Sequence, residues 1–216
     1  MKNSSRTIGF AGQTIELGSE RTLLWRDKEL LVAADLHLGR RLALETAGHG
    51  EALSVDIAAL QRLARVARES QVRRLLILGD FVHGAEAVAA PVIRVVADWR
   101  KTVSAEVLLV HGSYDHLPAP LLNRWDIEPV GDVLSIAPLL FRYKPAAGHP
   151  EPQICGHLHP CARLSKAADS MKLPCFVVEP NLLLMPSFGN HPDGYEISEK
   201  DNRVFYVISD GEVRPI

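Results

Sequence analysis

Short apolar runs that alternate with helical patterns constrain the fold of this 216-residue chain more than any other feature. Runs of four or five apolar residues, punctuated by glycine or aspartate, are typical of strands buried in a layered α/β fold. Four segments predict such strands: 30–34 (LLVAA), 75–78 (LLIL), 107–110 (VLLV) and about 139–143.

The segments between these runs carry the periodicity of amphipathic helices. Over residues 51–70, apolar residues recur at intervals of three and four, which places them on one helix face. These residues are Leu53, Ile57, Leu60, Leu63 and Ala67. Arg62, Arg65 and Arg68 lie on the other faces, and we expect a solvated helix surface there rather than a nucleic-acid contact. A second helix is predicted to begin near Pro91, a favourable first-turn residue.

Beyond residue 160 the pattern changes to short β-rich runs, namely CFVVE, LLLM and VFYVI. Strand–helix alternation followed by strands predicts two packed sheets with helices outside them. At this length we expect one domain, spanning residues 1–216, with a core large enough to need no disulfides.

Composition and charge exclude several classes of protein. A chain that is 47% hydrophobic and 23% charged is too apolar for intrinsic disorder. The net charge of -2 means that a nucleic-acid partner would need a local basic face. Three cysteines without a CxxC pair argue against a disulfide framework and a zinc ribbon. Because we find neither a long apolar span nor an apolar leader, we expect a cytoplasmic protein without membrane partners.

Acidic and histidine side chains gather where the apolar runs end. The first run ends in Asp35-Leu36-His37, the second in Gly79-Asp80, and a later element reads Gly156-His157-Leu158-His159. Residues two apart on a strand point to the same side, and sites in open α/β sheets collect at the carboxyl ends of strands. Two carboxylates and three imidazoles suit Mn²⁺, Fe or Zn²⁺ and are poor ligands for Ca²⁺.

The order ADLHLG, LGDFVHG, HGSYDH, GHLH resembles the calcineurin-like metallophosphoesterase superfamily. More narrowly, the stretches LLVAADLHLGR, LLILGDFVHG, ICGHLHPCARL and KLPCFVVEPNLLLMPSFG are similar to the bacterial ligase-associated DNA damage response endonuclease branch. The resemblance covers about residues 22–198. It implies a four-layer α/β sandwich, two packed mixed β-sheets flanked by helices, and a metal-dependent phosphodiester hydrolase. It also implies a nucleic-acid or other phosphodiester substrate and DNA-repair partners such as a ligase or helicase.

The same resemblance implies a two-metal site. Asp35, His37, Asp80 and His159 would hold the first metal, and Asp80 would bridge to a second metal that His157 also binds. Mn²⁺ is the first expectation for the cation, with Fe and Zn as alternatives.

Three positions depart from the family pattern, and all three belong to the second metal and the adjacent acid. In Gly112-Ser113-Tyr114-Asp115, Ser113 replaces the metal-binding Asn and Tyr114 replaces the catalytic His. Tyr143 stands where the branch has the His of H-E-P. The departures predict a remodelled site, with one tightly held metal and weak or absent occupancy of the second. Tyr114 and Asp115 remain the catalytic candidates, Tyr114 as a proton donor or a hydrogen-bond donor to phosphate.

Three functions stay open at this point: a weakened phosphodiesterase, a silenced module that binds phosphate or a partner, and a mononuclear hydrolase of small phosphoesters. His83 is expected either to line the site or to stand behind it. We expect surface or capping positions for His111, His116 and His149, and apolar packing for Cys155, Cys161 and Cys175.

Overall fold

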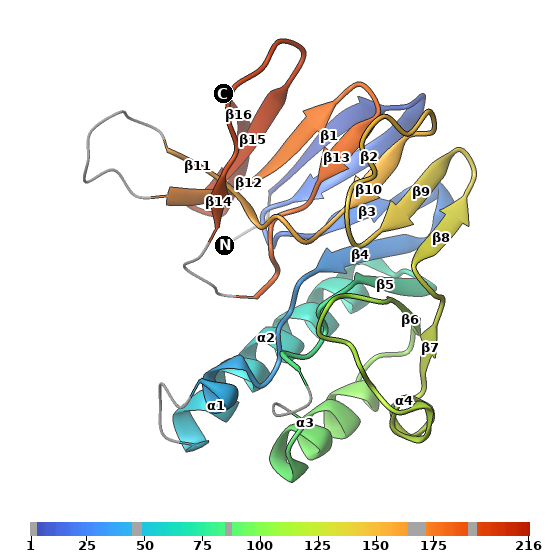
Figure 1. The fold of residues 1–216 in the computed structure, drawn as a ribbon, viewed down its shortest axis with the longest axis vertical. Helices are drawn as coiled ribbons and strands as arrows, with labels where there is room; N and C mark the ends of the chain where they lie inside the picture. Colours follow the sequence, from blue (N-terminus) through green and yellow to red (C-terminus); the bar gives the residue numbers. More distant parts are fainter. Residues whose placement is uncertain (1–3, 45–48, 85–87, 164–171, 190–193) are drawn as a thin grey trace.

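Two mixed β-sheets packed face to face form the centre of the molecule in the computed structural model, which describes residues 4–44, 49–84, 88–163, 172–189 and 194–216. The first sheet has seven strands in the order in which they occur along the chain (Figure 1). They are β1 (Ser5–Phe10), β2 (Gln13–Gly18), β3 (Leu23–Trp25), β4 (Leu30–Ala34), β5 (Arg74–Leu78), β6 (Glu106–Val110) and β7 (Ile127–Pro129). Strands β1 to β4 pair antiparallel and β4 to β7 pair parallel.

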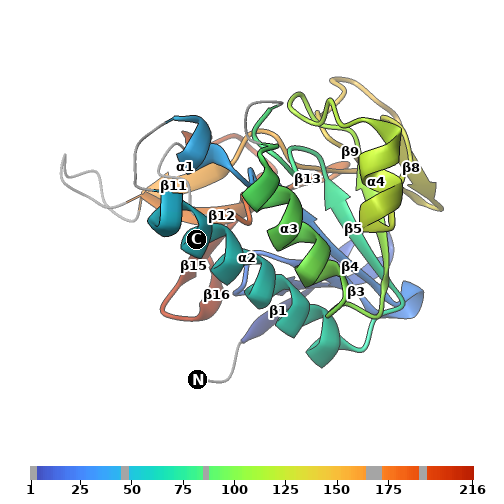
Figure 2. The ribbon, with the colours of Figure 1, turned by 90° about the horizontal axis from the view of Figure 1, so that it is seen from below.

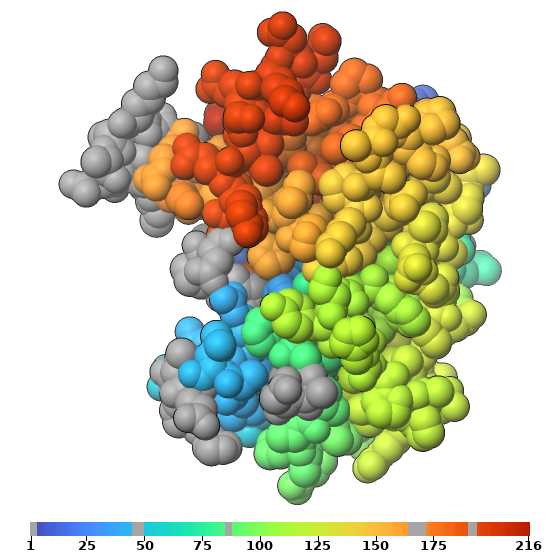
Figure 3. Space-filling view, viewed as in Figure 1, coloured from blue at the N-terminus to red at the C-terminus, as the bar shows by residue number. Residues whose placement is uncertain are grey.

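The second sheet has nine strands, with the path β14-β11-β12-β13-β10-β9-β8 and with β15 and β16 added beside β12. The strands are β8 (Val133–Ile136), β9 (Leu139–Arg142), β10 (Gln153–Cys155), β11 (Pro160–Arg163), β12 (Lys172–Glu179), β13 (Leu182–Leu184), β14 (Tyr195–Glu196), β15 (Val204–Ser209) and β16 (Glu212–Pro215). Its β9, β10 and β13 run parallel. In Figure 3 the yellow, orange and red segments of this sheet lie above the blue and green helical segments.

The helices lie on the outer face of the seven-stranded sheet (Figures 1 and 2). They are α1 (Arg40–Ala43), α2 (His49–Ser70), α3 (Ala90–Arg100) and α4 (Ala119–Trp125), and a 3-10 turn η1 (Arg26–Lys28) joins β3 to β4. In the ranges that the structure describes, no helix covers the outer face of the nine-stranded sheet (Figures 1 and 2). No helix among these residues is long and apolar enough to cross a membrane.

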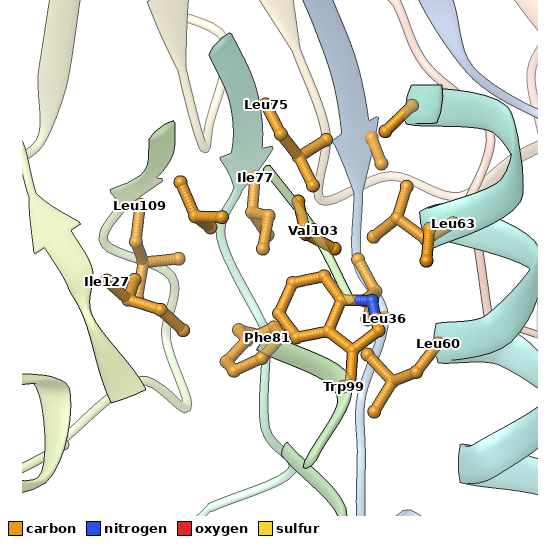
Figure 4. Packing of buried hydrophobic residues seen from close by; sticks show 14 of the residues in the cluster. Leu36, Leu60, Leu63, Leu75, Ile77, Phe81, Trp99, Val103, Leu109 and Ile127 are labelled. Carbon is orange, nitrogen blue, oxygen red and sulfur yellow. The ribbon is translucent and has the colours of Figure 1, made fainter. Parts of the chain in front are cut away.

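Strand alternation divides the core into two layers. On one face of β4, β5 and β6, Leu31, Ile77 and Leu109 pack against the helices. On the other face, Val32 and Leu76 join the inner side of the nine-stranded sheet. Figure 4 shows the helical layer, where Leu60 of α2 and Trp99 of α3 lie in one cluster with Ile77 of β5. Because both faces of these strands are covered, their sequences are continuous apolar runs.

The predicted fold class, two packed mixed sheets with helices outside them, is confirmed; in the described ranges the helices flank the seven-stranded sheet, which makes three layers and not the expected four. Strand β4 has the predicted bounds, β5 and β6 begin one residue earlier than predicted, and β9 ends at Arg142. Helix α2 begins at His49, and α3 has Pro91 in its first turn as predicted. All three cysteines are buried and free.

Candidate metal centre

The five predicted ligand residues share an unusual backbone conformation. Each has a positive φ, in a region that residues other than glycine seldom adopt. The values are 55° for Asp35, 51° for His37, 47° for Asp80, 69° for His157 and 44° for His159. The strands end before these residues, so left-handed turns orient the side chains, not the strand alternation that the sequence suggested. Backbone outliers of this kind cluster at functional sites, where neighbouring structure holds them in place.

Hydrogen bonds between the strand ends fix these turns. The Asp35 amide donates to the Gly79 carbonyl at 3.2 Å, and the His37 amide donates to the Asp80 carbonyl at 2.8 Å. Across the two sheets, the His157 amide donates to both carboxylate oxygens of Asp35, at 2.9 and 3.1 Å. The ends of β4, β5 and β10 are therefore joined directly.

Asp35, His37 and His159 each offer one ligand atom within 4.8 Å of the others. The Nε2 atoms of His37 and His159 lie 3.3 Å apart, and His159 Nε2 lies 3.6 Å from an Asp35 oxygen. Asp80 Oδ2 lies 3.6 Å from His37 Nε2. Imidazole nitrogens and carboxylate oxygens that face one point make a donor set suited to a divalent transition metal. The residues present fit such a cation.

The electrostatics of the centre agree with a cation. Asp35 is fully buried, and this burial raises the pKa of its carboxyl to about 6, with His159 acting in the opposite direction. An uncompensated buried carboxylate is costly, whereas a bound cation would stabilise its ionised form.

His83 contacts His37 at Nδ1, the ring nitrogen that does not face Asp80 and His159. The two Nδ1 atoms are 3.2 Å apart, so one ring donates and the other accepts. This contact leaves His37 Nε2 directed at Asp80 and His159. A hydrogen bond on the second ring nitrogen is the usual way in which a ligating histidine is oriented.

His157 has a different neighbour from the other predicted ligands. Its Nδ1 lies 2.7 Å from the hydroxyl of Tyr143, and that hydroxyl donates to Asp80 Oδ2 at 2.6 Å. Burial and the hydrogen bond to Asp80 raise the pKa of Tyr143 well above its usual value. Burial, followed by the charge of Lys144, lowers the pKa of His157. The Tyr143 hydroxyl thus joins Asp80 to His157.

Asp115 lies in the turn that follows β6, and its carboxylate faces the backbone. It accepts hydrogen bonds from the amides of Phe81 at 2.8 Å, Val82 at 3.2 Å and Gly112 at 2.9 Å. Burial raises the pKa of Asp115 to about 7, although these amides act in the opposite direction. A Cβ on Gly112 would lie 2.1 Å from the Asp80 nitrogen, so only glycine allows this approach. Asp115 therefore positions the turn against Asp80.

Tyr114 belongs to the same turn and is exposed to solvent. It is 42% exposed, its ring stacks on His83 at 4.6 Å between centroids, and its amide donates to Asp80 at 3.0 Å. A cleft of about 510 Å³ lies before it and before the predicted ligands. Sequence reasoning missed other residues that line this cleft: Arg40, Lys172, Gly194, Tyr195 and Glu196. Two of them had a local signal, because Arg40 ends the stretch LLVAADLHLGR and Lys172 begins the stretch KLPCFVVEPNLLLMPSFG.

The remaining predicted residues lie outside this cleft. Ser113 is exposed and borders a neighbouring hollow with His111, His116, Arg142 and Lys144. His149 is half-buried, and its Nδ1 accepts a hydrogen bond from the Glu151 amide at 3.2 Å. Neither His111, His116 nor His149 is among the grouped ligand atoms in the described part of the chain.

Residues 185–189 form a strap across the end of β4. Ser187 Oγ donates to the Asp35 carbonyl at 2.7 Å, and the Phe188 amide donates to the Ala34 carbonyl at 2.7 Å. Arg62 of α2 donates to the Phe188 carbonyl, with its guanidinium 4.0 Å from the centre of the Phe188 ring. The expectation of a solvated helix surface is therefore wrong for Arg62. The periodicity placed this residue outside the apolar face, but the strap covers that side of the helix.

No family model matches the sequence, and no curated protein sequence matches it. Among solved structures, the chain is similar to the crystal structure of Pseudomonas putida nuclease MPE, with a TM-score of 0.85 and 29% sequence identity. The similarity covers 99% of this chain and 100% of the nuclease chain. The two proteins therefore share the packed-sheet fold over nearly their whole length.

Proposed function

We propose that this protein is a metal-dependent phosphodiesterase that cleaves nucleic acid, with an active site remodelled around one cation. The observation that carries the proposal is the convergence of Asp35, His37 and His159 on one point, in a fold shared with a nuclease. The sequence resemblance adds the calcineurin-like metallophosphoesterase superfamily and its DNA-repair endonuclease branch. It also adds a ligase or helicase partner and Mn²⁺ as the preferred cation. The free cysteines favour a cytoplasmic location.

Asp35, His37, His159 and Asp80 would hold the cation. When bound, a divalent cation polarises a phosphoryl oxygen and lowers the pKa of a water molecule that it binds. His83 keeps His37 Nε2 directed into the site, and the His157 amide holds the Asp35 carboxylate in place. Tyr114 lines the cleft, and its hydroxyl donates a hydrogen bond or a proton to the substrate there. Asp115 acts through the backbone and keeps Tyr114 beside Asp80.

The cleft has the groups that a nucleic-acid strand needs. Arg40 and Lys172 supply positive charge beside the metal centre, although the net charge of the chain is -2. Tyr114 and Tyr195 are 42% and 65% exposed and offer ring faces on which unpaired bases stack. Local basic groups with exposed aromatic rings favour a nucleic acid over a small phosphoester.

A second candidate function is a silenced module that binds phosphate or a partner protein. The observation that favours it is the hydrogen bond of Tyr143 to both Asp80 and His157, which leaves fewer groups for catalysis. The two candidates differ in turnover but not in metal binding, so both properties must be measured.

The test uses protein purified without chelator and assayed for metal content and for cleavage of single-stranded and duplex DNA with added Mn²⁺. We expect cleavage that depends on Mn²⁺. Asp35→Asn, which keeps the size of the side chain, should lower both metal content and cleavage, the latter on the order of 100-fold or more. Asp98→Asn is the matched control, because Asp98 is exposed on α3 and pairs with Lys101.

Each contrary outcome has a distinct meaning. Metal binding that depends on Asp35 without turnover of DNA or of a small diester would favour the silenced module. Turnover of small esters alone would favour the mononuclear hydrolase. Full metal content in Asp35→Asn would show that the site assignment is wrong.

A further inference from the structure

Tyr143 is the residue at the centre that neither the grouped metal ligands nor the cleft chemistry explains. It follows β9, and its side chain is 7% exposed between the two sheets. Its hydroxyl lies at hydrogen-bond distance from two residues of the centre, Asp80 at 2.6 Å and His157 at 2.7 Å.

The ring of Tyr143 is held tightly in this position. A Cβ on Gly79 would lie 2.2 Å from its Cδ2 atom, so the ring packs directly on the glycine backbone. On another side, the ring meets His157 edge to face, with 4.7 Å between centroids. The neighbours therefore fix where the hydroxyl lies.

The protons of the three groups form one ordered chain. The Asp80 carboxylate can only accept, so the hydroxyl proton of Tyr143 points to Asp80 Oδ2. The hydroxyl oxygen then accepts a hydrogen bond from His157, which makes Nδ1 the protonated nitrogen of that ring. The Tyr143 hydroxyl thus joins Asp80 to His157, and the Ser113 side chain also forms a hydrogen bond with it.

The same Asp80 oxygen also faces the group of metal ligands, at 3.6 Å from His37 Nε2. The resemblance implies that Asp80 would be shared by two cations, and cations in two-metal sites lie about 3.5 to 4 Å apart. Here the hydroxyl of Tyr143 lies on the side of Asp80 where the second cation would bind Asp80 and His157.

We propose that the Tyr143 hydroxyl takes the place of a second cation between Asp80 and His157, so that the centre binds a single divalent cation. The proposal rests on the proposed function only in assigning the first cation to Asp35, His37, Asp80 and His159. Transition metals bind nitrogen and oxygen ligands at about 2.0–2.2 Å. A cation bound to both Asp80 and His157 would displace the hydroxyl that now lies 2.6 and 2.7 Å from them.

The experiment measures the Mn²⁺ stoichiometry of the full chain by equilibrium dialysis and the coupling between Mn²⁺ ions by electron paramagnetic resonance. The wild-type chain should bind about one Mn²⁺ with an uncoupled spectrum. Tyr143→His replaces the hydroxyl by a metal ligand, and should bind about two Mn²⁺ with a spin-coupled spectrum. Tyr143→Phe is the matched control: it keeps the ring on Gly79, adds no ligand, and should stay at about one Mn²⁺.

Three results would overturn the proposal. The first is two coupled Mn²⁺ ions in the wild-type chain, a result that does not depend on whether any variant folds. The second is a folded Tyr143→His chain that still binds one Mn²⁺. The third is a tyrosinate-to-iron charge-transfer band in the Fe³⁺-loaded wild-type chain that Tyr143→Phe removes, because Tyr143 would then be a metal ligand.

These readouts are independent of catalysis. A wild-type chain that binds one cation, gains a second in Tyr143→His and cleaves no phosphodiester would support the role of Tyr143 and contradict the proposed function. Cleavage by a wild-type chain that binds two coupled cations would contradict the role of Tyr143 and the single cation, but would support the assignment as a phosphodiesterase.

Discussion

At the scale of single residues, the candidate metal centre is built from residues whose backbone conformation would cost glycine less free energy. Asp35, His37, Asp80, His157 and His159 all have positive φ. Such residues cost on the order of 1–3 kcal/mol each and persist only where the surroundings hold them. Hydrogen bonds from the Asp35 amide to the Gly79 carbonyl and from the His37 amide to the Asp80 carbonyl provide that support. Glycine would relieve the strain but would remove the atoms that could bind a metal, so the proposed metal site accounts for these residue types.

Tyr114 allows a test of chemistry at this scale. We expect Tyr114→Phe to lower DNA cleavage by about 10²-fold, the lower end of the range for general acid catalysis, because the alkoxide leaving group needs a proton. Turnover of bis(p-nitrophenyl) phosphate should change little, since nitrophenolate leaves without one. Both rates are measured with saturating Mn²⁺, and the ring stays in its stack on His83.

The control for this variant is Tyr195→Phe, which removes a hydroxyl from the same cleft at a position 65% exposed. It should leave both rates near those of the wild-type chain. Equal losses with both substrates in Tyr114→Phe would show that the hydroxyl does not act as the proton donor.

At the scale of elements, the sequence was most informative where strands are covered on both faces. The apolar runs of β4, β5 and β6 have one stable location, between helices and a second sheet, so their bounds were predicted to within one residue. Strands β1 to β3 were not predicted. In β1, four of the six residues are exposed. Its sequence has neither a continuous apolar run nor a clear alternation of apolar and polar residues that would distinguish a strand from a loop.

Long-range contacts explain what the sequence could not predict. The types and order of the ligand residues pointed to a metal centre, but the bond between Tyr143 and Asp80 joins residues 63 positions apart. The strap at 185–189 contacts α2 through the hydrogen bond from Arg62 to the Phe188 carbonyl, which joins residues 126 positions apart in the sequence. No periodicity within one helix could show that Arg62 has a partner there.

The strap gives a prediction for this scale. Arg62→Met keeps most of the apolar stem and removes the donor to the Phe188 carbonyl. We expect the free energy of unfolding to fall by about 1.5–3 kcal/mol, the usual value for a hydrogen bond from a charged group. Metal affinity should also weaken, because Ser187 of the strap holds the Asp35 carbonyl.

Urea unfolding with and without Mn²⁺ measures both effects. Arg68→Met is the matched control, since Arg68 lies on an exposed position of the same helix. Equal losses in Arg62→Met and Arg68→Met would mean that the strap is not held by Arg62.

At the scale of the whole molecule, the candidate metal centre joins the two sheets. Asp35, His37 and Asp80 follow strands of the seven-stranded sheet, whereas His159 follows β10 of the nine-stranded sheet. A cation held by all four would link the sheets at their strand ends. The edges of β1, β2 and β16 already meet at another border of the sandwich. Metal binding should therefore stabilise the sandwich as one unit and not one loop.

This link predicts a thermal shift that requires residues from both sheets. Mn²⁺ at 100 times its dissociation constant should stabilise the native state by about 2.7 kcal/mol. For a chain of this length, each kcal/mol raises Tm by about 2–4 °C, so the shift should be about 5–10 °C. Chelator should reverse it, and either Asp35→Asn or His159→Gln should abolish it, because each removes a ligand from one of the two sheets. The probe is tryptophan fluorescence, since Trp25, Trp99 and Trp125 are all buried, Trp25 between the sheets and the other two in the helical layer. If Mn²⁺ raised the midpoint as much in His159→Gln as in the wild-type chain, the cation would be held by one sheet alone.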